Sequence, residues 1–140
     1  MREILYRGKT SNGEWLEGFA IFADGKTFIL FDAKIVFDKA YPENKLNFML
    51  AEVIPETIGQ YTGLTDKNGT KIFEGDIVET NKRKKYEVRL YKSAWAIWND
   101  KYKFDYEKWD FFSTFAQKIK VIGNIHDNPE LLGTEGIKNV

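Results

Sequence analysis

The chain has 140 residues, a length that suits one domain or two small subdomains sharing a core. Its 43% hydrophobic and 16% aromatic content is ample for a buried core and argues against disorder except at the ends. The 21 basic and 21 acidic side chains give a formal net charge of +0, which excludes a strong overall field towards polyanions. The chain holds no cysteine, which rules out disulfides and thiolate chemistry and fits a reducing cytoplasm.

The first residues, from Met1 to Tyr6, carry no signal-peptide pattern, and no apolar run is long enough to span a bilayer. We therefore expect a cytoplasmic protein.

The N-terminal part reads as a succession of β-hairpins. An alternating segment, Glu3 to Arg7, and an apolar run, Glu14 to Phe22, flank the turn residues of Lys9 to Gly13. Asp24-Gly25 is a second hairpin signal, and it leads into Thr27 to Phe31, which is rich in strand-forming residues.

The next segment, from Ala33 to Ile54, predicts short strands separated by a loop. Ala33 to Phe37 has the composition of a short strand, and Asp38 to Asn47 reads as a loop because Pro42 interrupts it. A strand pattern returns at Phe48 and stops before Pro55.

The stretch from Thr57 to Val78 organises the rest of the chain. Two apolar pieces flank a polar turn in which Asn68-Gly69 favours a hairpin, since both residues tolerate positive φ. Glu74-Gly75-Asp76 reads as a turn that feeds a strand, as at the entrance of small SH3-like barrels, a comparison by analogy of fold.

The C-terminal part continues the β pattern. The expected strands are Asp76–Thr80, Tyr86–Tyr91, Ser93–Trp98 and Gln117–Ile125. Tyr102 to Phe115 mixes strand and helix spacing, and we favour a loop or strand followed by a helical turn. Asn128 and Pro129 have the composition of a helix N-cap and first helical residue, and Gly133 would end that short helix.

Several of these motifs recur together in a known family. They are Tyr6–Gly8 with Gly13–Trp15, Pro55–Gly63, Asp66–Gly69, Ile72–Val78 and Val121–Leu132. In these motifs the chain resembles the YopX family over nearly its whole length. The resemblance implies bacteriophage or prophage origin, and it assigns no catalytic, cofactor-binding or metal-binding residue.

Two groups of polar residues are candidates for chemical sites. His126 beside Asp127 could act as a general base or metal ligand, but a metal needs three or four ligands and we favour a surface role. Glu74, Asp76 and Glu79 could hold Mg²⁺ or exchange protons, but a turn in which carboxylates accept backbone N–H groups is the better interpretation. We therefore expect no catalytic residue, no cofactor and no metal site.

A basic run offers the nearest functional alternative. Its candidate contacts to nucleic acid are Lys82, Arg83, Lys84 and Lys85, with Tyr91, Trp95 and Trp98 for base stacking. The competing interpretation is a solvated hairpin tip whose charge discourages edge pairing. Net neutrality removes the usual electrostatic footprint of a nucleic-acid binder and favours the hairpin tip.

The aromatic segment from Tyr102 to Phe115 leaves two alternatives open. It could supply anchors for a protein partner, or it could cap the end of a barrel.

We expect a mainly β fold with one or two short helical turns. A hairpin-rich subdomain over residues 1–54 would precede a small SH3-like barrel over residues 55–140. The expected function is a non-enzymatic accessory module that acts through protein contacts, with another protein or with itself as a homo-oligomer. The alternative is weak binding of single-stranded nucleic acid. The expected core comprises Trp15, Phe19, Ile21, Ile58, Tyr61, Leu64, Ile72, Ile77, Val78, Val88, Val121, Ile122 and Ile125.

Overall fold

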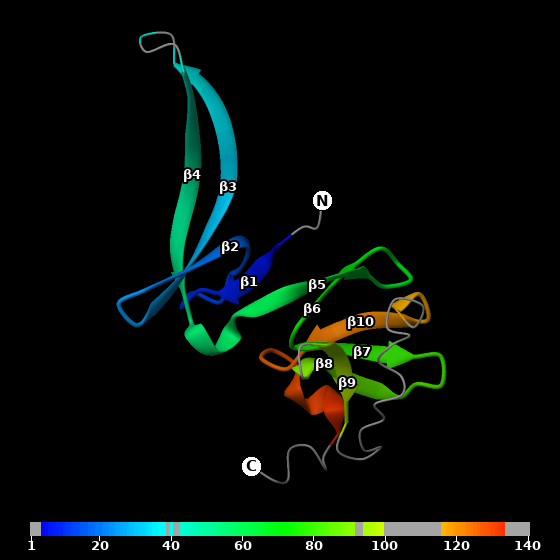
Figure 1. The fold of residues 1–140 in the computed structure, drawn as a ribbon. Coiled ribbons are helices and arrows are strands. Elements are labelled where there is room, and N and C mark those ends of the chain that lie inside the picture. Colours follow the sequence, from blue (N-terminus) through cyan, green and yellow to red (C-terminus); the bar gives the residue numbers. More distant parts are fainter. Residues whose placement is uncertain (1–3, 39, 41–42, 92–93, 100–115, 134–140) are drawn as a thin grey trace. The chain divides into compact units, whose positions relative to one another are not determined.

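The computed structural model describes residues 4–38, 40, 43–91, 94–99 and 116–133 (Figure 1). Its strands are β1 (Tyr6–Lys9), β2 (Trp15–Ala23), β3 (Lys26–Asp38), β4 (Glu43–Val53), β5 (Gly59–Thr65), β6 (Lys71–Phe73), β7 (Asp76–Thr80), β8 (Lys85–Tyr91), β9 (Ala94–Trp98) and β10 (Ile119–Asn124). Two short 3-10 helices are η1 (Pro55–Thr57) and η3 (Pro129–Leu132). The mainly β class is confirmed. The chain divides into two compact units, one up to Gln60 and one from Tyr61.

The first unit is an antiparallel meander in the order β4-β3-β2-β1, with Gly59 and Gln60 of β5 paired beside β1. The hairpin expected at Asp24-Gly25 is confirmed: both residues have positive φ, 50° and 75°, and they join β2 to β3 as a two-residue turn.

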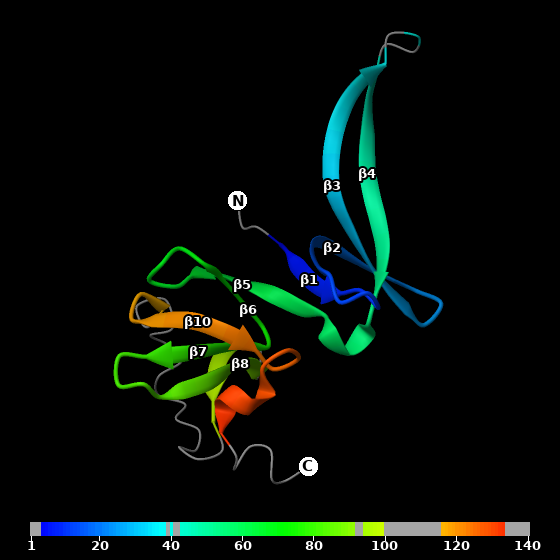
Figure 2. The ribbon, with the colours of Figure 1, turned by 180° about the vertical axis from the view of Figure 1, so that it is seen from behind.

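β3 and β4 form one long hairpin that continues past the end of β2 (Figures 1 and 2). Two expectations were wrong here, because Thr27–Phe31 and Ala33–Phe37 belong to one strand and residues 43–47 are strand rather than loop. Pairing with β3 stabilises the extended backbone of residues 43–47, although their own composition favours a loop. A bulge joins the two halves of β3.

The core of the first unit lies on one face of this meander. Its buried hydrophobic residues are Leu16, Ile29 and Val53. Placing Phe19 and Ile21 in the core was wrong, since both are exposed on the other face of β2. The inward positions on either side of Phe19 hold small residues, Gly18 and Ala20. A β-carbon at Gly18 would lie 1.9 Å from the carbonyl oxygen of Leu30, so the strands approach too closely for a larger side chain.

The second unit contains the β5–β6 hairpin and a four-stranded antiparallel sheet in the order β10-β7-β8-β9. Among the described residues this sheet does not close, so the expected small SH3-like barrel is replaced by an open sheet. Each strand follows its expected segment to within a few residues, so the difference concerns closure rather than the elements themselves.

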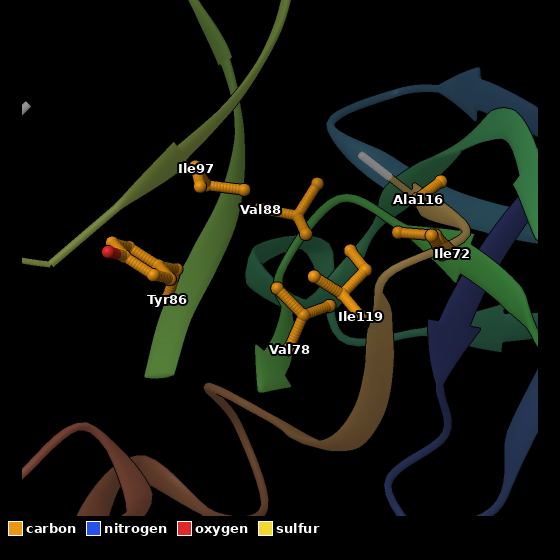
Figure 3. Close-up of a cluster of buried hydrophobic side chains, with 7 residues drawn as sticks. All are labelled: Ile72, Val78, Tyr86, Val88, Ile97, Ala116 and Ile119. Atoms are coloured by element: carbon orange, nitrogen blue, oxygen red, sulfur yellow. The ribbon is translucent and has the colours of Figure 1, made fainter. Parts of the chain in front are cut away.

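The core of the second unit draws side chains from five strands (Figure 3). Its buried members are Ile72, Val78, Tyr86, Val88, Ile97, Ala116 and Ile119. The expected core residues Tyr61, Ile72, Ile77, Val78 and Val88 are confirmed as buried. Trp15, Ile58, Leu64, Val121, Ile122 and Ile125 are partly buried.

Three hairpin turns share one construction. In each, the first residue exchanges backbone hydrogen bonds with the fourth and fifth, and its side-chain oxygen accepts the N–H of the fifth. The turns are Thr10–Glu14, Asp66–Thr70 and Thr80–Lys84. The fourth residue of each turn has positive φ, and these residues are Gly13, Gly69 and Arg83, respectively. The turn expected at Asn68-Gly69 is therefore confirmed, with three residues between Asp66 and Thr70.

The C-terminal helix expected at Asn128 is a single 3-10 turn. Pro129 is its first residue, as expected, and Gly133 follows it with φ 96°. Asn128 is its N-cap residue, as expected, although its side chain makes no capping hydrogen bond. Its Oδ1 accepts the N–H of Asn124 instead, at 3.3 Å, and holds the end of β10.

Candidate protein-interaction surface

The first unit exposes large hydrophobic side chains along β2, β3 and β4. Exposed fractions reach 66% at Ile35 and 58% at both Phe19 and Phe37. Single exposed apolar residues are normal in proteins, so the question is whether these gather on one face.

Strand register answers that question for β2 and for the part of the β3–β4 hairpin that lies before the bulge, up to Phe31. Phe19 pairs with Leu30, Ile21 pairs with Phe28, and Leu30 pairs in turn with Leu50. Directly opposed residues point to the same side of a sheet, so all five share the face that is turned away from the buried core.

The bulge in β3 extends this face to the part of the hairpin beyond it, from Lys34 onwards. Asp32, at φ 53°, and Ala33 together oppose the single residue Phe48. One extra residue shifts the alternation, so that Ile35, rather than its neighbour Val36, joins the face of Leu30. Without the bulge, the apolar stripe would change sides halfway along the hairpin.

The result is a continuous apolar surface, which we call the hairpin face. Its members are Phe19, Ile21, Phe28, Leu30, Ile35, Phe37, Leu46, Phe48 and Leu50. Charged residues share its inner end, where Glu52 is paired with Phe28 and Lys26 lies two residues before Phe28 on β3. Lys34 and Lys45, from the same two strands, lie on the opposite face of the hairpin. The sequence does contain a signal for this surface, because apolar residues alternate at positions 46, 48 and 50. Without the strand pairing and the bulge, however, the sequence alone could not show which face of the sheet these residues occupy.

The basic run lies at the tip between β7 and β8. Lys82, Arg83 and Lys84 are exposed, while Lys85 is half-buried in β8 and its Nζ lies 3.6 Å from Glu79 Oε2. The tip therefore places three cations in solvent and uses the fourth within the sheet.

The aromatic residues considered for base stacking do not form one platform. Trp95 packs against the core of the second unit, whereas Trp98 lies three residues away on the other face of β9, with the guanidinium of Arg89 5.2 Å from its ring. The side chain of Tyr91 and the whole segment Tyr102–Phe115 lie outside the described residues.

The acidic group is engaged within the fold. Asp76 is buried and its Oδ2 accepts the N–H of Phe73 at 2.7 Å, which is the turn role expected for it. Glu79 lies on the other face of β7 and pairs with Lys85 and Lys120. Asp76 and Glu79 therefore do not converge on one point.

His126 lies in the turn after β10. Its backbone N–H donates to Asn124 Oδ1 at 3.0 Å, and the backbone N–H of Asp127 donates to the same oxygen. Across the part of the chain that the structure describes, no three His, Asp or Glu side chains are grouped closely enough to hold a metal ion. Within the same residues, no helix has the length and apolarity needed to cross a membrane.

Comparison with known proteins gives a family and a fold. The model of the YopX protein family matches residues 20–133. The chain is similar to the crystal structure of protein EF1440 from Enterococcus faecalis, with 25% sequence identity and a TM-score of 0.65, over 95% of this chain and 100% of that one. No curated protein matches the chain. Because the family model spans most of the chain, including most of the hairpin face and the four-stranded sheet, this protein belongs to the YopX family.

Proposed function

We propose that this YopX family member is a non-enzymatic accessory protein that acts by binding other protein surfaces through the hairpin face. The observation that carries the proposal is the concentration of nine large apolar side chains on one side of β2, β3 and β4.

The physical argument is the cost of leaving that surface in water. Each buried Å² of apolar surface contributes roughly 25 cal/mol, so exposing the face forgoes a large stabilisation that a partner would supply. Phe19, Phe37 and Phe48 would act as aromatic anchors, the residue class that is enriched at interface centres. The opposite face of the hairpin, which carries Lys34 and Lys45, would stay in solvent.

We further propose phage or prophage origin and action in the cytoplasm of the bacterial host. The origin is supported by the motifs that the chain shares with the YopX family, and the location by the complete lack of cysteine.

Binding of single-stranded nucleic acid is the second candidate, and the three exposed cations of the β7–β8 tip favour it. The positions of Trp95 and Trp98 on opposite faces of β9 weigh against it, because a stacking groove needs its aromatics on one side.

The test compares three tagged forms of the protein in phage-infected cells. The face variant is Ile35→Glu/Phe48→Glu, and the matched control is Val36→Glu/Met49→Glu, which adds the same charges one residue away on the opposite face. All four side chains are at least 43% exposed, so neither variant disturbs a buried site.

After nuclease treatment, we expect wild type and the control to retain a protein partner, or an untagged second copy, that the face variant loses. Partner binding must then be reproduced with purified components. Recovery of nucleic acid alone, or equal capture by all three forms, would contradict the proposal.

A further inference from the structure

We propose that the occupant of the hairpin face is the same face of a second copy of this chain, packed sheet against sheet about a two-fold axis. This inference rests on the proposed function and names the partner.

The first argument is area. A large side chain offers roughly 200 Å² when fully exposed. With most of the nine residues near half exposed, the face presents on the order of 800 Å². A stable interface needs about 800 Å² from each partner, whereas the largest apolar patch of an ordinary monomer covers about 300–600 Å². The hairpin face therefore has the size of a dimer interface.

The second argument is self-complementarity. A surface that presents nine large apolar side chains requires a partner face that is largely apolar, because a buried unpaired charge or polar group is costly. The same face in a second copy meets this condition, and a two-fold axis makes the contact closed. The formal net charge of +0 leaves no overall repulsion between copies.

The third argument is the stability of the outer half of the hairpin. Beyond the bulge, β3 and β4 pair only with each other, from Lys34↔Asn47 outwards. Ile35, Phe37 and Leu46 are 66%, 58% and 52% exposed there. A two-stranded hairpin without a covered face is marginally stable in water, and a second sheet would supply the cover.

β4 is also the outermost strand of its sheet, so two copies could instead pair edge to edge. That arrangement would leave the apolar side chains in water. It also predicts a different geometry, since residues 48 and 49 would then lie equally close to the partner strand, whereas face packing brings only residue 48 near it.

The first measurement is the mass of the purified full chain in sedimentation experiments. We expect about twice the monomer mass of 16.3 kDa for wild type and for Val36→Glu/Met49→Glu. For Ile35→Glu/Phe48→Glu we expect the monomer, with a dimer dissociation constant raised about 100-fold or more, since four carboxylates would meet in an apolar contact. Monomeric wild type at micromolar concentrations well above those of the capture experiment, or dimers in both variants, would overturn the inference.

The second measurement remains decisive even if the face variant folds poorly. Because the chain has no cysteine, Phe48→Cys and Met49→Cys each introduce one reactive thiol. A bismaleimide of about 10 Å, the spacing of packed sheets, should join two copies at position 48 and not at position 49. Equal cross-linking at both positions, or at neither, would overturn face packing. A monomer that still captures another protein through this face would refute the second copy while leaving the proposed function standing.

Discussion

Asp66 and Val121, 55 positions apart in the sequence, are joined by a hydrogen bond from the Val121 N–H to Asp66 Oδ2 at 2.8 Å. The other carboxylate oxygen of Asp66 accepts the N–H groups of Asn68 and Thr70 at 2.8 and 2.9 Å. This buried side chain therefore closes the β5–β6 turn and fixes β10 beside it. One carboxylate therefore binds both a local turn and a distant strand, beside the pairing of β10 with β7.

Asp66→Ala should lower the free energy of unfolding by about 2–4 kcal/mol, because it leaves three backbone N–H groups without their charged acceptor. Asp66→Asn should cost less, since its remaining oxygen can still accept the two bonds within the turn. Urea denaturation gives both values. Glu14→Ala, which removes an exposed carboxylate, is the control and should change little. Equal stability of Asp66→Ala and wild type would show that the three bonds carry no net stabilisation.

Gly75→Val should destabilise the protein by about 1–3 kcal/mol. Gly75 is buried at φ 89°, its N–H donates to the carbonyl of Val88, and its own carbonyl accepts the N–H of Ile125. A β-branched residue is strained at this φ, and any relaxation of the backbone would disturb both bonds. Gly69→Val, at φ 83° with open space around it, measures the strain alone and should cost less. An unchanged denaturation midpoint for Gly75→Val would refute the argument.

Arg83→Gly should stabilise the protein by about 0.5 kcal/mol. Arg83 has φ 60° at the position that Gly13 and Gly69 occupy in the two matching turns, and a side chain there costs about 1 kcal/mol. The greater entropy of glycine in the unfolded chain offsets part of that gain. Lys82→Gly, one residue earlier and without positive φ, should destabilise by a similar amount. A loss of stability in Arg83→Gly would mean that the arginine side chain makes a compensating contact.

Local chemistry explains which elements could be predicted from the sequence. Asp24-Gly25 and Asn68-Gly69 mark turns because their residues tolerate the positive φ that those turns require. Whether the C-terminal sheet stays open or closes into a barrel depends on pairing between strands far apart in the sequence, which no short segment encodes. The start of β4 at Glu43 likewise depends on β3, which lies across the hairpin.

The candidate surface was missed for a related reason. Phe19 and Ile21 were placed in the core because large apolar residues usually lie there, yet the inward positions of β2 need residues as small as Gly18. The period-2 pattern shows that two faces exist but not which one is buried. The bulge at Asp32, which keeps the apolar residues of the hairpin on one side, has no sequence signal as strong as a glycine.

The last prediction concerns nucleic acid. Wild type should bind a labelled single-stranded oligonucleotide only weakly, with a dissociation constant above about 10 µM at about 150 mM salt. Lys82, Arg83 and Lys84 are exposed, but Lys85 is held near Glu79 and the chain has no net charge to strengthen the tip. Three flexible cations also lose side-chain entropy when they bind. Fluorescence anisotropy, measured over a series of salt concentrations, gives the affinity and its salt dependence.

Binding at the β7–β8 tip can be distinguished from non-specific attraction to positive charge with the variant Lys82→Ala/Arg83→Ala/Lys84→Ala/Lys85→Ala. Its control replaces four lysines elsewhere in the described residues with alanine: Lys26, Lys34, Lys45 and Lys118. If the weak binding is non-specific, both variants should lower it alike, because each removes four positive charges and so the same number of possible phosphate contacts. Submicromolar wild-type binding that only the tip variant abolishes would instead make nucleic acid the ligand of this protein. Strong binding that survives in both variants would point to stacking on Trp98, which Trp98→Ala would then test.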